Sequence, residues 1–314
     1  MSFLMRGATL ALAWFLVVNV VLSLAAAALA RVTPRSPGWL LAMRLFPAVA
    51  SAGFAALVFV PSYWQFEPRE TAEGFDLTLM TFASLGLFLL AAGCVRGVVS
   101  WRLARRRARL WTETSTPLPP GFMGSTIPAF RIEADAPLMA LVGLARPRLF
   151  VTRGLLDVLT HDELAAAVAH EVGHHRARDN VKRLAMRCAA DVLSFLPASR
   201  RLEQQWTAAA EHAADAAAAN AGAGLRLALA SALVKVAQLM PPAGPSREPI
   251  SALVGAAALA ARIERLVEDV EDQPSDVFRP AAGAIAALAA MAVAYAPIVQ
   301  TVHRVTELLV HSLP

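Results

Sequence analysis

The chain contains four long stretches of almost uninterrupted apolar residues. They cover residues 9–30, 39–60, 77–95 and 281–298. A helix needs about 20 such residues to cross a bilayer. In the second stretch Pro47 predicts a kink, and Arg44 lies near enough to the start to extend toward the polar side of the membrane. The pattern therefore predicts a mostly α-helical protein with about four transmembrane helices.

Composition supports this prediction. Hydrophobic residues make up 57% of the chain and the mean hydropathy is +0.51, values that a soluble protein rarely reaches. Charged residues make up 17%, with a net charge of +5. On such a chain a basic surplus favours contact with membrane lipid and disfavours direct nucleic-acid binding. Cys94 and Cys188 form no metal-binding pair by spacing and are predicted to be buried free thiols.

The loop charges predict the orientation of the spans. Six arginines follow the third span between residues 96 and 109, and Arg31 and Arg35 follow the first, whereas residues 61–76 contain one basic residue. By the positive-inside rule the N-terminus lies outside and residues 96 to about 280 lie in the cytoplasm. The scarcity of lysine beside abundant alanine suggests a bacterium, so the expected location is the bacterial cytoplasmic (inner) membrane. Reporter fusions after Thr112 and Pro314 would test this orientation.

The expected organisation has four parts. Residues 1–99 form three transmembrane helices, 100–112 a basic juxtamembrane helix on anionic lipid, 113–278 a cytoplasmic α+β domain, and 279–314 the fourth span with a short tail. In the domain, short apolar runs predict strands at 130–134, 139–142 and 148–152. Further helices are expected over 181–196, 199–219, 225–239 and 250–270, and the first of these could also be embedded in the membrane.

A helix that begins after Thr160 carries the first chemical motif. Thr160 and Glu163 form a T-x-x-E capping box, about ten residues before the H-E-x-x-H run from His170 to His174. Residues four apart share one helical face, so both imidazoles can bind one metal ion while Glu171 serves as general base. Near a helix end His174 and His175 could instead be cationic end residues, an explanation that does not suit His170.

A second motif supplies the missing ligand. A hydrolytic zinc site needs three protein ligands, and Glu211 of the run E-H-A-A-D is the best candidate. Asp215, one turn later, is placed to accept the free ring N–H of a bound histidine, and His170 is the expected partner. The alternatives are that His212 is the third ligand or that Glu211 is solvated, as expected for Glu203. The sequence thus predicts one Zn²⁺ per chain.

These residues resemble a known bacterial family. The runs P-R-L-F-V-T-R-G-L-L (147–156), D-E-L-A-A-A-V-A-H-E-V-G-H-H-R-A-R-D-N (162–180) and E-H-A-A-D are similar to the beta-lactam-sensor antirepressor membrane metallopeptidases. The resemblance is looser to heat-shock and prenyl-protein membrane zinc endopeptidases. It implies a gluzincin-like domain with zinc on His170, His174 and Glu211 and with Glu171 as general base. It also implies a substrate-binding edge strand formed by Arg148, Leu149, Phe150, Val151 and Thr152. Unlike the sensor proteins, this chain ends soon after the fourth span, without a penicillin-binding domain.

Three functions are consistent with these features. The first is cleavage of a cytoplasmic or membrane-proximal protein, such as a transcriptional repressor, in regulatory signalling. The second is quality control of membrane proteins. The third is a non-catalytic signalling or scaffold protein with a structural zinc, which normally has four protein ligands. The sequence leaves the oligomeric state undetermined.

Overall fold

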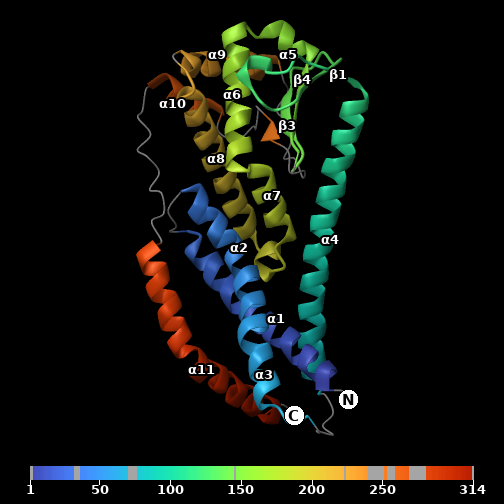
Figure 1. Cartoon of the computed structure of the whole chain (residues 1–314), viewed down its shortest axis with the longest axis vertical. Coiled ribbons are helices and arrows are strands. Elements are labelled where there is room, and N and C mark those ends of the chain that lie inside the picture. Colours follow the sequence, from blue (N-terminus) through green and yellow to red (C-terminus); the bar gives the residue numbers. More distant parts are fainter. Residues whose placement is uncertain are drawn as a thin grey trace.

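The computed structural model describes residues 3–31, 36–69, 76–144, 146–222, 224–239, 251–252, 259–268 and 281–312. Most of these residues are helical. Figure 1 shows a bundle of long helices at one end of the molecule and a domain of helices and a small sheet at the other. Helix α4 runs along both parts.

Three helices among the described residues are long and apolar enough to cross a membrane. They are α1 (Phe3–Leu29), a composite helix over Pro37–Phe66, and α4 (Leu77–Glu113). They correspond to the first three predicted spans. Asp76 begins α4, because its Oδ2 accepts a hydrogen bond of 2.9 Å from the Thr78 N–H.

The composite helix changes its hydrogen bonding near Pro61. It consists of α2 (Pro37–Phe54), a π-helical turn (Ala55–Phe59) and α3 (Val60–Phe66). The helix continues through Pro47, so the irregular turn falls later than the predicted kink. Pro61 has no N–H for the carbonyl four residues earlier, that of Leu57, and its ring crowds that carbonyl. A wider turn relieves the crowding.

Helix α4 is continuous from the membrane span through the arginine run, so the predicted basic segment 100–112 is its last part. Two arginines lie over tryptophan rings of the same helix, Arg105 over Trp101 at 5.3 Å and Arg107 over Trp111 at 5.6 Å. In each pair the positive guanidinium is attracted to the face of the aromatic ring, and this attraction stabilises the helix. Only Thr114 separates α4 from the first strand.

The sheet has five strands in the order β1-β2-β4-β3-β5. They are β1 (Ser115–Pro117), β2 (Ala129–Ile132), β3 (Met139–Val142), β4 (Arg148–Thr152) and β5 (Ser251–Ala252). β2 and β4 are parallel and the other neighbours are antiparallel. The three predicted strands are β2 to β4. The two missed strands, β1 and β5, have three and two residues, too few for an alternating pattern.

Six further helices follow β4 in the described part of the domain. They are α5 (Arg153–Val158), α6 (His161–Ala177), α7 (Asp179–Cys188), α8 (Pro197–Ala219), α9 (Leu225–Leu239) and α10 (Leu259–Glu268). Of these, α5 and α6 pack against the sheet. The predicted helix over 181–196 is wrong in its second half. After Cys188 the chain turns, and Asp191 caps a short 3-10 turn over Val192–Phe195. The predicted helix over 250–270 is β5 and α10 in its described parts, and its other residues lie outside the described ranges.

The capping box at the start of α6 is present as predicted. The Thr160 N–H donates to Glu163 Oε2 at 2.8 Å, and the Glu163 N–H donates to the Thr160 hydroxyl. The same carboxylate also accepts hydrogen bonds from Ser231 and Lys235 of α9, at 2.6 and 2.7 Å. One side chain therefore both starts α6 and joins it to α9.

Glu163 gives a pH-dependent contribution to stability. Burial would raise its pKa, but hydrogen bonds from Lys235, Ser231 and Thr160 lower the pKa to about 2. The folded pKa is below the ordinary value of 4.5, so the contribution is complete above about pH 4.5 and disappears as the pH falls toward 2. We expect Glu163→Gln to lower the thermal unfolding midpoint at pH 7, with the difference from wild type narrowing below pH 4.5. A difference that stays constant down to pH 2.5 would contradict this.

The last helix, α11 (Ala281–Ser312), contains the fourth predicted span. It returns along the bundle and ends near the start of α1 (Figure 1). The Tyr295 hydroxyl donates to the Leu57 carbonyl at 2.7 Å, a carbonyl to which Pro61 cannot donate because it has no N–H. Ser62 donates to the Val299 carbonyl at 2.7 Å. Side chains of α11 are described from residue 294 to 310, so the crossing of the membrane by 281–298 stays a prediction.

Candidate metal centre

Helix α6 holds the H-E-x-x-H run in the interior of the domain. His170, Glu171 and His174 are all buried, with exposed fractions of 0%, 0% and 1%. Gly173 allows α6 to approach α8 closely, because a Cβ there would lie 3.2 Å from the Ala214 Cα. This approach brings the two predicted motifs face to face.

The predicted ligands meet at one point. Nε2 of His170 lies 3.6 Å from Glu211 Oε2, and Nε2 of His174 lies 3.5 Å from Glu211 Oε1. Potential ligand atoms of the three residues all lie within 4.8 Å of one another, and the two imidazole rings are nearly perpendicular, at 87°. Three ligands of a tetrahedral zinc ion, at about 2.0–2.1 Å from it, stand about 3.3–3.5 Å apart. The spacing of nitrogen and oxygen atoms therefore fits a zinc ion.

The bonding of these atoms points to the same conclusion. The two Nε2 atoms are buried and make no hydrogen bond to the described residues, whereas Glu211 Oε2 lies 3.0 Å from the Arg262 guanidinium. A buried polar atom without a partner is costly. A cation bound between the histidines and Glu211 would give both Nε2 atoms a partner.

The opposite nitrogen of each ring contacts a carboxylate. Nδ1 of His170 lies 2.9 Å from Asp215 Oδ1, although its N–H is not well aligned for a hydrogen bond. Nδ1 of His174 hydrogen-bonds Asp179 Oδ2 at 2.8 Å. Such carboxylates orient histidine ligands and fix the tautomer with Nε2 free for a metal. The structure thus brings Asp215 to His170, where the sequence placed it.

Asp179 is a site residue that the sequence analysis missed. It follows Arg178, which ends α6 in the left-handed conformation with φ 56°, and this reversal returns the carboxylate to the histidine one turn earlier. Asp179 carries a signal similar to that of Asp215, because it is a carboxylate about one turn beyond a metal ligand. Lys182 holds the second carboxylate oxygen at 3.0 Å.

Two arginines near Glu211 were also missed. Arg262 of α10 lies 3.0 Å from Glu211 Oε2 and donates two hydrogen bonds to Asp215, at 2.6 and 2.7 Å. Arg183 of α7 lies 3.7 Å from Glu211 Oε1. Arg262 has an exposed fraction of 1%, so it neutralises part of the negative charge inside the domain. The only sequence signal for it is a basic residue on the apolar face of an amphipathic helix.

The electrostatic surroundings favour a positive charge between the ligands. Burial would lower the pKa of His174, but hydrogen bonding to Asp179 and contact with Glu211 raise the pKa to about 9. Burial would likewise raise the pKa of Glu211, yet both histidines hold it well below its usual range. A centre that favours a bound proton so strongly also favours a metal cation in the same place.

Glu171 differs from the other carboxylates of the centre. Burial raises its pKa above the usual range. Both of its oxygens are buried and have no hydrogen-bond partner among the described residues. A buried carboxylate whose raised pKa favours the protonated form, and whose oxygens have no hydrogen-bond partner among the described residues, is suited to accept a proton and release it again. This is the behaviour required of a general base.

The predicted edge strand is corrected by the sheet topology. β4, which contains Arg148, Leu149, Phe150, Val151 and Thr152, pairs with β2 on one side and with β3 on the other. It is a central strand, and Leu149 to Thr152 are buried, as a continuous apolar run would indicate. β3 lies beyond it, and the Asn180 side chain donates to the carbonyls of Leu141 and Gly143 at 3.0 and 3.2 Å, joining β3 to α7.

The other histidines whose side chains are described lie outside this centre. His161 and His175 are exposed, and His212 is half-buried on α8. His303 stacks on Phe66 between α11 and α3, and with Glu67 and Glu307 it forms a second, less buried group of metal-ligand type. Glu67 of that group already pairs with Arg6 at 3.0 Å. His303 is thus an interface residue, as the sequence predicted.

Comparison with known proteins agrees with this geometry. Residues 132–262 match the model of peptidase family M48. The matched stretch contains both motifs as well as Asp179 and Arg262. None of the curated proteins compared gives a match. The family match supports a metal-dependent peptidase, and His170, His174 and Glu211 are the cluster that could hold the metal.

Proposed function

We propose that this chain, whose domain matches peptidase family M48, is a membrane-bound zinc metalloendopeptidase. Its substrate is a cytoplasmic or membrane-proximal protein. The observation that carries the proposal is the convergence of His170, His174 and Glu211 on one point beside Glu171, whose buried oxygens have no partner among the described residues. A bound metal explains the first arrangement and proton transfer explains the second.

The chain's own residues divide the reaction between them. A zinc ion held by His170, His174 and Glu211 would supply Lewis acidity, which activates water and polarises the peptide carbonyl. Glu171 accepts the proton of the attacking water and then donates it to the leaving amine. Asp215 and Asp179 hold the histidine rings in place, and Arg262 fixes Glu211 and Asp215.

The sheet offers a surface for an extended substrate beside this centre. β3 is the strand next to β4, and among the described residues its outer edge pairs with β5 at Ala140 and Leu141. A peptide could add to this edge by main-chain hydrogen bonds, either extending or replacing β5. The edge of β3 thus takes the role that the sequence analysis gave to β4.

We favour regulatory cleavage, such as cleavage of a transcriptional repressor, as the biological role. The motivation is the resemblance of the motifs to antirepressor peptidases. Quality control of membrane proteins is the second candidate. The number of peptide bonds cleaved distinguishes the two roles. One defined scissile bond indicates regulation, whereas cleavage at many bonds indicates quality control.

A structural zinc site in a scaffold protein is less well supported. Such a site is normally closed by four protein ligands. In the part of the chain that the structure describes, the group around His170 contains three, and neither His175 nor His212 joins it. An open fourth position is typical of catalytic zinc.

The proposed location is the bacterial inner membrane, with the domain in the cytoplasm. The positive-inside pattern of the arginines motivates this orientation. The start of α1 and the end of α11 lie together at the end of the bundle opposite the sheet (Figure 1). Four crossings of the membrane would produce that arrangement.

Zinc content is the first test of the proposal. We expect detergent-purified wild type to contain about one zinc per chain, and His174→Ala and Glu211→Ala to lose most of it, because each removes one of three ligands. Elemental analysis measures the content. His175→Ala is the matched control, since His175 lies next to the site but is exposed. Wild-type protein without zinc would refute the enzyme proposal.

A further inference from the structure

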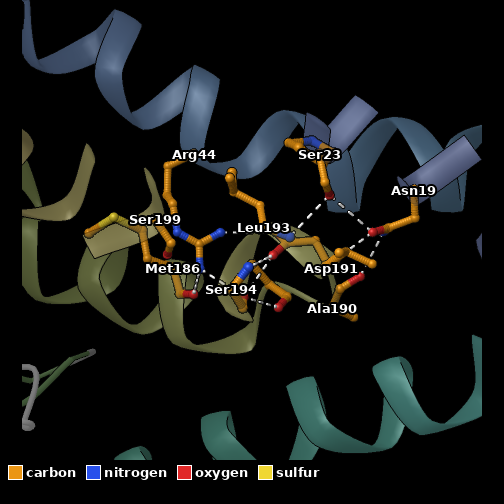
Figure 2. A network of polar contacts seen from close by, with 12 residues as sticks. Asn19, Ser23, Arg44, Met186, Ala190, Asp191, Leu193, Ser194 and Ser199 are labelled. Carbon is orange, nitrogen blue, oxygen red and sulfur yellow. Dashed lines mark hydrogen bonds and ion pairs between the residues drawn. The ribbon is translucent and has the colours of Figure 1, made fainter. Parts of the chain in front are cut away.

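The turn between α7 and α8 lies among the transmembrane helices. Helix α4 approaches the end of α7 at two glycines. A Cβ at Gly93 would lie 2.7 Å from the Cys188 carbonyl oxygen, and one at Gly97 would overlap the Cys188 sulfur. From the other side, Asn19 and Ser23 of α1 and Arg44 of α2 contact the turn (Figure 2). The thiol of Cys188 is free, as predicted, but exposed on this surface.

The turn reaches well below the end of α1. Asn19 lies ten residues before Leu29, where α1 ends (29 − 19 = 10). At 1.5 Å per residue this is about 15 Å along the helix. On α4 the turn contacts Gly93, Arg96 and Gly97, which lie at the cytoplasmic end of the predicted span 77–95. The turn is therefore packed between the cytoplasmic ends of the spans.

Side chains of the spans satisfy the backbone of the turn. Asn19 donates to the Ala190 carbonyl at 3.0 Å and accepts from the Val192 N–H at 2.9 Å. The Ser23 hydroxyl accepts from the Leu193 N–H at 3.1 Å, and Arg96 donates to the Ala189 carbonyl at 2.7 Å. Non-helical backbone at membrane depth is tolerated only where protein covers it and satisfies its polar groups.

Arg44 holds both helices that flank the turn. Its guanidinium donates to Asp191 and Glu203 at 3.0 Å each, to Ser194 at 3.0 Å, and to the Met186 carbonyl at 3.2 Å. Arg44 and Asp191 have exposed fractions of 1% and 0%. The sequence predicted that Arg44 extends toward the polar side of the membrane, but its side chain is buried against the turn. Glu203, which was expected to be solvated, accepts a hydrogen bond from Arg44.

The two helices gripped by Arg44 carry parts of the metal centre. α7 begins with Asp179, which contacts His174, and α8 carries Glu211 eight residues after Glu203 (211 − 203 = 8). We propose that Arg44 is a positioning residue of the metal centre. It locks the α7–α8 hairpin between the spans and thereby sets where Asp179 and Glu211 stand relative to α6. This inference rests on the proposed function, and it makes the position of α2 a determinant of zinc affinity.

The test compares two pairs of buried charges in full-length protein in liposomes. In the first variant, Arg44→Met is combined with Asp191→Asn, so that no carboxylate is left buried without its partner. The control is Arg6→Met with Glu67→Gln, a pair that is 3.0 Å apart and similarly buried but lies at the opposite end of α1. Arg44→Lys is a conservative variant that keeps the charge but loses the guanidinium fork.

Two measurements report on the inference. The first is zinc affinity, by competition with a chromophoric chelator. The second is labelling of Cys188 by a membrane-impermeant maleimide in a Cys94→Ser background. We expect the Arg44/Asp191 variant to bind zinc 10-fold to 100-fold more weakly, the usual effect of losing support for a ligand. Cys188 should label slowly in wild type, because its sulfur packs against Gly97 of α4, and several-fold faster in the variant, where the turn is released. Arg44→Lys should show smaller changes in the same directions. The Arg6/Glu67 control should change neither the zinc affinity nor the labelling of Cys188.

Several outcomes would overturn the inference. One is a folded Arg44/Asp191 variant with zinc affinity within twofold of wild type, and another is wild-type Cys188 that labels as fast as a surface thiol. If that variant does not fold, Asn19→Leu replaces it, because it removes two hydrogen bonds from the turn and no charge. Unchanged Cys188 labelling in Asn19→Leu overturns the inserted turn. Wild type that binds no zinc refutes the proposed function, whereas zinc-binding wild type with an unaffected Arg44/Asp191 variant refutes the role of Arg44 alone.

Discussion

Glu171→Gln should abolish turnover while leaving the bound zinc in place. The substitution keeps the shape of the side chain but removes its ability to accept a proton, which contributes about 10² to 10⁴ in rate in general-base catalysis. The ligands His170, His174 and Glu211 are unchanged, so zinc content and KM should stay near wild type. Peptide hydrolysis by purified protein, together with elemental analysis, measures both quantities.

The matched control is Asp162→Asn on the same helix. The Asp162 side chain is 85% exposed and lies two turns before His170. It should keep full activity. Preserved turnover in Glu171→Gln would show that another group accepts the proton and would remove Glu171 from the mechanism.

Arg262→Met should cause the largest loss of stability at the centre. The substitution leaves Asp215 and Glu211 buried without their guanidinium, and removing one partner of a buried ion pair costs about 3–5 kcal/mol. For a domain of this size that corresponds to roughly 6–20 °C in the thermal unfolding midpoint. The midpoint should be measured in detergent with a chelator present, then with zinc added. Zinc should recover part of the loss, because the cation also balances Glu211.

Arg265→Met provides the comparison on the same helix. Arg265 is half-buried, one turn from Arg262, and outside the metal centre. It should shift the midpoint by only a few degrees. If Arg262→Met behaves like Arg265→Met, then Arg262 does not stabilise the two carboxylates.

The sequence predicted those features that depend on short spacing. The i,i+4 spacing on a helix predicted that His170 and His174 share one face and that Glu211 and Asp215 share another. The capping box at Thr160 predicted where α6 begins. The charge and apolar patterns gave the first three spans. All of these depend on local geometry, which a helix fixes without reference to the rest of the chain.

The features that were missed depend on tertiary contacts. Arg262 reaches the centre from a helix about fifty residues after Glu211, and Arg44 meets Asp191 across 147 positions. No periodicity links such residues. The continuous apolar run of β4 is typical of a central strand, but the family resemblance implied that β4 is the edge strand that binds the substrate. The turn after Cys188 interrupts a pattern that looks helical, because its polar groups find partners in α1 and α2.

The length of α4 has a mechanical consequence. Its 37 residues extend about 55 Å at 1.5 Å per residue, and only Thr114 joins it to β1. Its middle is held against α7 at Gly93 and Gly97, so the arm beyond Gly97 has 16 residues (113 − 97 = 16) and a length of about 24 Å. A tilt of about 5° about that point moves the end of the arm, which carries the edge of the sheet, by about 2 Å, as much as a zinc–ligand distance of about 2.0–2.1 Å. A small reorientation of one span is thus transmitted to the domain that carries the metal centre.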